Sequence, residues 1–199
     1  RNCSDLKVLQ DIIDLNIENG NFDQYSAVMD DSGNNNGIIE TFELGLSGVD
    51  GFGQVVASME WNEEGSLIYL RFSMILELPN SFGNLTSLKT LILLDNQLTV
   101  LPESMENLVE LETLEIVSNL ITTIPENIDN LIKLSVLKLN NNALIKLPDA
   151  IGALSNLKIL YLDNNQISSI PESIENLNQL EELLLSNNNI ESLPDNIVN

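Results

Sequence analysis

Hydrophobic residues return along most of the chain at a fixed interval of 23 residues. Five leucines, five asparagines and all six prolines keep this interval. They are Leu88, Leu111, Leu134, Leu157 and Leu180; Asn96, Asn119, Asn142, Asn165 and Asn188; and Pro79, Pro102, Pro125, Pro148, Pro171 and Pro194. A self-similar period of 20 to 50 residues is typical of solenoids, in which each copy forms one coil. The pattern therefore predicts a stack of coils that share one continuous core.

One interval reads L-x-x-L-x-L-x-x-N-x-L-x-x-L-P-x-x-I-x-x-L, as in residues 157–177. The alternating L-x-L predicts a short strand with one buried face. The asparagine predicts a sharp turn, where its amide can satisfy unpaired backbone groups and repeat as a ladder. Proline suits the first position of a helical turn, so a short helical segment is expected after it.

This consensus resembles the short 23-residue type of the leucine-rich repeat family. Five full copies run from about Leu88 to Pro194, followed by a partial last copy. A degenerate copy precedes them, in which Ile68 and Leu70 take the inward strand positions and Ser73 replaces the asparagine. The resemblance implies an α/β solenoid: a right-handed arc with parallel strands on its concave side, short helical or 3-10 turns on its convex side, and a helical N-terminal cap. It also implies a binding scaffold.

Residues 1–65 lack the 23-residue period and hold eight of the ten glycines. Ser4 is a suitable N-cap for a helix, and apolar residues follow at helical spacing. Because a terminal coil exposes its core edge, we expect residues 1–65 to form a cap, with Phe52 and Trp61 covering the first leucines. The expected organisation is a cap over 1–65 and a repeat array over 66–199.

The stretch "DDSGNNNGIIETFE" within this cap resembles an EF-hand calcium loop. With Gly37 at the glycine position, the candidate ligands are Asp31, Ser32, Asn34, Asn36 and Glu43. The first position should be Asp but is Ser32, and Asp31 can replace it only in a loop widened by one residue. The alternative interpretation is an Asn/Gly-rich turn without a metal. A bound calcium ion would have a structural role, and no other cofactor is expected.

Strand residues between the buried leucines are expected to face the concave side. The first three coils place mainly apolar side chains there, which is typical of a protein interface. The predicted partner-binding residues are Tyr69, Arg71, Phe72, Met74, Ile92, Leu94, Glu115, Val117, Leu120, Lys138 and Tyr161, with Tyr69, Arg71 and Phe72 as anchors. Two alternatives are that the cap folds back over this patch, or that the residues only suit a β-strand. Lys138 beside Glu115 is interpreted as a cross-strand ion pair.

Charge and composition exclude several functions. The formal net charge is -22, from 30 acidic and 8 basic residues, so nucleic acid is not an expected partner. No apolar run approaches the roughly 20 residues that cross a bilayer, and membrane insertion is not expected. The chain has no histidine and one cysteine, Cys3. The usual nucleophile and base pairs are therefore missing, and the chain is predicted not to be an enzyme.

The sequence favours a non-enzymatic protein-binding module that uses the concave face. The alternative is a calcium-stabilised extracellular adhesive or surface protein that binds glycans or host proteins. Secretion or the cell surface is favoured over the cytoplasm, since "EWNEEGSLIYLRFS" is similar to the start of extracellular repeat arrays. At the C-terminal edge, Leu183 and Leu185 are expected to face water. That edge is then covered either by further chain or by self-association with a second copy.

Overall fold

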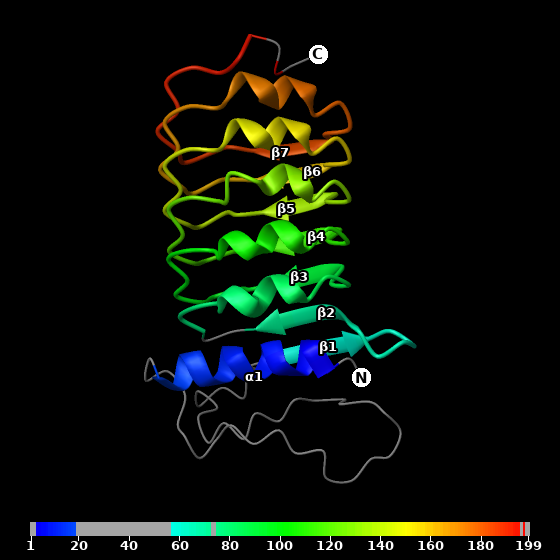
Figure 1. Cartoon of the computed structure of the whole chain (residues 1–199). Helices are drawn as coiled ribbons and strands as arrows, with labels where there is room; N and C mark the ends of the chain where they lie inside the picture. Colours follow the sequence, from blue (N-terminus) through cyan, green and yellow to red (C-terminus); the bar gives the residue numbers. More distant parts are fainter. Residues whose placement is uncertain (1–2, 19–56, 73–74, 196, 198–199) are drawn as a thin grey trace.

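The computed structural model describes residues 3–18, 57–72, 75–195 and 197, which form a solenoid (Figure 1). Helix α1 spans Cys3–Glu18. The strands are β1 (Ala57–Trp61), β2 (Leu67–Phe72), β3 (Thr90–Ile92), β4 (Thr113–Glu115), β5 (Val136–Lys138), β6 (Ile159–Tyr161) and β7 (Glu182–Leu184). The 3-10 turns are η1 (Asn80–Asn84), η2 (Glu103–Asn107), η3 (Ile128–Asn130), η4 (Asp149–Ala153) and η5 (Glu172–Asn176).

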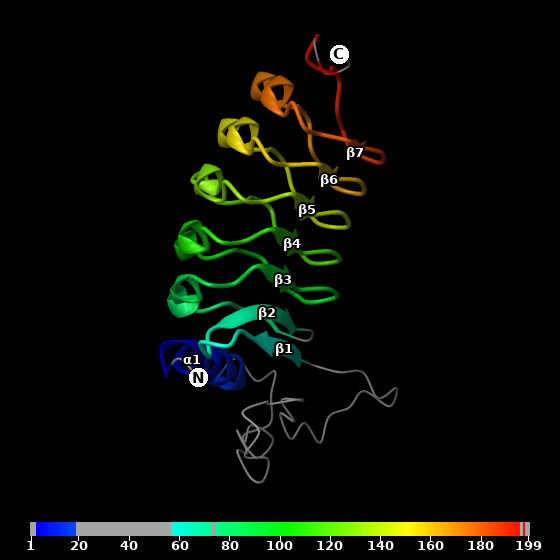
Figure 2. The ribbon, with the colours of Figure 1, turned by 90° about the vertical axis from the view of Figure 1, so that its right-hand side faces the viewer.

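The seven strands form one sheet whose order follows the chain from β1 to β7. Strands β2 to β7 are parallel, and β1 pairs with β2 in the antiparallel direction. The strands lie on the inner side of the arc and the 3-10 turns on the outer side (Figure 2). The predicted fold class is confirmed: a solenoid with parallel concave strands, convex 3-10 turns and an N-terminal helix.

The core is one continuous column of aliphatic side chains. In the fourth coil, Leu137, Leu139, Leu144, Ile151 and Leu154 are fully buried, and the neighbouring coils bury the equivalent residues. One coil alone would leave these side chains half covered, because each packs against the coil before it and the coil after it. The stack therefore gains its stability from interfaces between coils.

The predicted asparagine ladder is present. Asn119 Oδ1 accepts a hydrogen bond from the Leu98 amide at 3.1 Å, and its Nδ2 donates to the Leu93 carbonyl at 2.7 Å. The equivalent hydrogen bonds join each of the other coils to the coil before it, and they are made by Asn96, Asn142, Asn165 and Asn188. The residue before each ladder asparagine has a positive φ, between 52° and 57°. Each coil thus repeats the same two residues: one with a positive φ that makes the sharp turn, and an asparagine whose side-chain amide pairs with backbone groups there.

Helix α1 closes the first end of the array, beside η1. Val8, Leu9 and Ile12 of this helix are buried in the same core as the first coil. The buried Asp5 accepts a hydrogen bond from the Leu67 amide at 2.8 Å, where β2 begins. Trp61 packs partly buried against the core, as expected. Phe52 and the rest of 19–56 lie outside the described residues, so the boundary at residue 65 stays a prediction.

Candidate binding surface

The first coil of the array is two residues shorter than the sequence period indicates. Leu70 pairs with Leu91, which is 21 residues later, whereas Leu91 pairs with Leu114 at the full interval of 23. Two residues separate the buried Phe72 from the buried Ile75, and four separate the corresponding Leu93 and Leu98. The shortening therefore falls in the turn that follows β2.

This shift corrects the prediction for Phe72. It was expected on the concave face as an anchor, but it is 1% exposed and occupies the inward position equivalent to Leu93. Ile68, expected inward, is only partly buried. Tyr69 and Arg71 lie on the concave side, as predicted. Their cross-strand partners on β3 are Thr90 and Ile92, two residues earlier than the 23-residue interval indicates. Met74 lies outside the described residues.

We define the concave surface as the strand residues that alternate with the buried leucines, together with the residue that follows each strand in the same alternation. Its members are Tyr69, Arg71, Thr90, Ile92, Leu94, Thr113, Glu115, Val117, Val136, Lys138, Asn140, Ile159, Tyr161, Asp163, Glu182, Leu184 and Ser186. No described helix or strand lies over it (Figure 2). The described part of the cap thus leaves this face open.

The half of the concave surface nearer the C-terminus carries a polar network. Lys138 Nζ lies 2.8 Å from Glu115 Oε1 across β4 and β5, so the predicted ion pair is confirmed. The same ammonium group lies 5.6 Å from the centre of the Tyr161 ring on β6. The Tyr161 hydroxyl donates a hydrogen bond to Glu182 on β7. Sequence reasoning missed Glu182, because it pairs in register with Ile159 and so stands one column away from Tyr161.

The Tyr161 phenol should lose its proton at a higher pH than an ordinary tyrosine does. Its hydrogen bond to Glu182, partial desolvation and the charges of Glu182 and Asp163 raise its pKa above the usual value. The interaction is present while the phenol keeps its proton, and it is lost as the pH rises through the raised pKa. The absorbance rise of phenolate, taken as the difference between the wild type and Tyr161→Phe, should have a midpoint at a higher pH than that of an ordinary tyrosine. Glu182→Gln should lower that midpoint, and an unchanged midpoint would contradict the assignment.

The half nearer the N-terminus holds a cluster of apolar side chains next to the polar residues Arg71, Thr90 and Thr113. Ile92, Leu94 and Val117 lie on β3, β4 and the residues just after them, and each is partly exposed. Leu120, which follows the ladder asparagine, is 53% exposed. The concave strands of the later coils also carry Val136, Ile159 and Leu184, so the predicted grading from apolar to polar coils stays a prediction.

Other predicted features lie elsewhere or outside the described residues. The calcium candidates Asp31, Ser32, Asn34, Asn36 and Glu43 are not among the described residues, so calcium binding stays a prediction. Within residues 3–18, 57–72 and 75–195, no three His, Cys, Asp or Glu side chains gather as metal ligands. No helix in the described part of the chain has the length and apolarity to cross a membrane.

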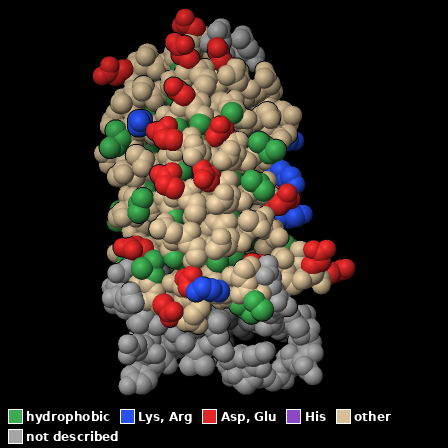
Figure 3. Space-filling view, in the orientation of Figure 1, with side chains coloured by type: hydrophobic (Ala, Val, Ile, Leu, Met, Phe, Trp, Pro, Cys, Tyr) green, Lys and Arg blue, Asp and Glu red, His purple; other side chains and the backbone are tan. Residues whose placement is uncertain are grey.

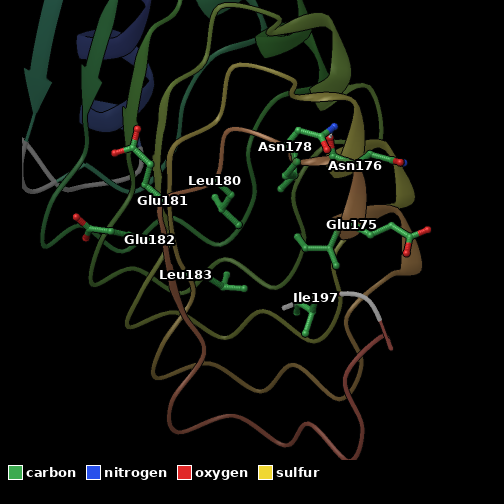
Figure 4. Close-up of a pocket in the computed structure, with 10 residues that line it drawn as sticks. Glu175, Asn176, Asn178, Leu180, Glu181, Glu182, Leu183 and Ile197 are labelled. Carbon is green, nitrogen blue, oxygen red and sulfur yellow. Dashed lines mark hydrogen bonds between the residues drawn. The ribbon is translucent and has the colours of Figure 1, made fainter. Parts of the chain in front are cut away.

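The last coil has an open hollow at the C-terminal end of the stack (Figure 4). Leu180, Leu183 and Ile197 point into it, while the carboxylates of Glu181 and Glu182 point away. Leu183 and Leu185 are partly buried against the core, less exposed than expected. Because this edge is rimmed by acids, a second copy that docked edge to edge would bring like charges together. Self-association stays a prediction.

The comparisons with known proteins agree with this geometry. The leucine rich repeat family model matches residues 132–190. A leucine-rich repeat protein of Leptospira interrogans has 40% sequence identity and a TM-score of 0.61, covering 63% of this chain and 32% of its own. The family match and the fold together identify residues 132–190 as leucine-rich repeats. The chain spans about a third of the Leptospira protein.

Other leucine-rich repeat structures share the fold over different lengths. The ectodomain of the Arabidopsis thaliana receptor kinase SOBIR1 has 25% identity and a TM-score of 0.59, covering 96% of this chain and 95% of its own. The Arabidopsis receptor kinase HAESA, solved with the peptide hormone IDA and the co-receptor SERK1, has 33% identity and a TM-score of 0.55. That match covers 62% of this chain and 22% of the receptor. No curated protein matches the chain.

Proposed function

We propose that the chain is a protein-binding module that docks its partner on the concave surface. One observation carries the proposal: the adjacent apolar side chains of Ile92, Leu94 and Val117 stand on a face that no described element covers. These positions have no role in the core, which the intervening leucines fill. An exposed apolar patch next to polar groups is typical of a site for another protein.

The family and the charge support the same function. Leucine-rich repeat proteins are typically binding modules, and HAESA has been solved with both a peptide ligand and a protein co-receptor. The convex side carries acidic side chains over most of its height and few basic ones (Figure 3). With a formal charge of -22, the module favours partners that bring positive charge.

A pair of variants tests the proposal. Ile92→Asp places a charge within the apolar part of the concave surface, whereas Ile132→Asp makes the same change in the connection after η3, at a side chain 57% exposed. Random 12-residue peptides displayed on phage are selected on the wild-type chain. The dissociation constant of the selected peptides should rise about fivefold to thirtyfold with Ile92→Asp, since an apolar anchor contributes about 1–2 kcal/mol.

Ile132→Asp should leave that dissociation constant unchanged, and both variants should keep the wild-type circular dichroism spectrum. Leu94→Asp provides a second variant on the same surface. Selected peptides that bind both concave variants as tightly as the wild type would contradict the proposed site.

A further inference from the structure

We infer that the concave surface recognises an extended segment with a definite order of charges: an Asp or Glu side chain at one end, apolar residues in the middle, and a Lys or Arg at the other end. The inference rests on the proposed function, because it assigns the chemistry of the partner at that same surface. In this arrangement the acidic residue meets Arg71, the apolar residues meet Ile92 and its neighbours, and the basic residue meets Asp163 and Glu182.

Arg71 stands apart from the other cations. Each of the six lysines lies within 4.0 Å of a carboxylate oxygen of this chain. Among the described residues, Arg71 is the one cation that forms no such pair, and it is exposed on β2. In a chain with 30 acidic residues, a guanidinium on the open face that pairs with none of the described carboxylates is available to a ligand.

The packing of the coils explains why Arg71 is left unpaired. Most lysine pairs join the same position of neighbouring coils, as Lys138 does with Glu115 and Lys158 does with Glu181. The cross-strand partners of Arg71 are Ser58 on β1 and Ile92 on β3, and neither carries a charge. Arg71 therefore stands beside an apolar residue, where a carboxylate from outside can approach it.

A guanidinium beside an apolar side chain fits a particular ligand. Its planar donors match the two oxygens of a carboxylate, and the neighbouring Ile92 offers contact for an apolar residue next in the segment. The overall negative charge of the chain opposes a ligand that carries only acidic groups. A segment that also brings a basic residue avoids this repulsion.

The other end of the surface has the opposite charge. Asp163 is partly buried and Glu182 is exposed, and both lie beside Tyr161, whose pKa they help to raise. Neither forms an ion pair with a described lysine or arginine. From β2 to β6 or β7 the surface crosses four or five strand spacings, about 19–24 Å at about 4.8 Å each. About six or seven extended residues cover that length.

The display experiment also tests this inference when Arg71→Ser is added, with Lys133→Ser as the control cation outside the strands. The displayed peptides have no free carboxyl terminus, so any acidic preference comes from Asp or Glu. Peptides selected on the wild-type chain should place Asp or Glu about six or seven positions from a Lys or Arg, with apolar residues between them. Arg71→Ser should remove the acidic preference and weaken a selected peptide about threefold to tenfold.

A peptide in which the selected Glu is replaced by Gln should lose nothing further on Arg71→Ser, because the two changes remove the same contact. If Ile92→Asp abolishes binding but Arg71→Ser and Lys133→Ser behave alike, the inference fails and the proposed function stands. If the selected peptides ignore Ile92→Asp, the proposed function fails and the inference fails with it. A library that yields no binder, or binders without the charge order, also overturns the inference.

Discussion

Replacing Asn119 by alanine is expected to lower the free energy of unfolding by about 3–5 kcal/mol, a large share of the stability of an ordinary domain. The side chain is 5% exposed and connects two coils. Its loss leaves the Leu98 amide and the Leu93 carbonyl without the partner that each has now. Each unsatisfied buried group costs about 1–3 kcal/mol.

Denaturant unfolding followed by circular dichroism measures this loss. Asn107→Ala is the matched control, because Asn107 is an exposed asparagine at the end of η2 and not part of the ladder. The control should stay within about 0.5 kcal/mol of the wild type. Equal stabilities for the two variants would show that the asparagine ladder does not hold the coils together.

The second large effect is expected from Gly152→Ala. A Cβ atom at Gly152 would lie 2.1 Å from the backbone oxygen of Ser173 in the next coil. Because that oxygen belongs to the main chain, η4 and η5 must move apart to make room. Such overpacking costs about 1–3 kcal/mol, and the midpoint of thermal unfolding should fall by several degrees.

Asp129→Ala is the control for this variant, since residue 129 holds the same place one coil earlier and already carries a Cβ atom. Gly83→Ala should repeat the effect of Gly152→Ala, because its Cβ would lie 2.1 Å from the Ser104 oxygen. The packing account would be wrong if Gly152→Ala and Asp129→Ala melted at the same temperature.

The sequence predicted the coil well because each position of the repeat has one physical task. The leucines at the 23-residue interval are buried, the ladder asparagines satisfy the turn, and the prolines precede the 3-10 turns. The Glu115–Lys138 pair followed directly from the same interval. These features depend only on the 23-residue interval, and so they can be predicted from the sequence alone.

The first coil could not be predicted in this way. A fixed interval placed Phe72 on the surface, but the turn after β2 has two residues fewer, and the true register buries Phe72 and sets Arg71 beside Ile92. The Tyr161–Glu182 hydrogen bond joins adjacent columns, which a comparison of equivalent positions does not reveal. The glycines at 83 and 152 likewise showed their role only when neighbouring 3-10 turns were seen in contact.

Hydrogen exchange of the whole chain, with and without a selected peptide, tests most directly whether the concave strands are where a partner binds. Bound peptide should slow amide exchange in the segments that contain β3 and β4, residues 90–94 and 113–117, and leave η2 and η3 at the free rate. Slowed exchange confined to the 3-10 turns, with no change in those strand segments, would contradict the account.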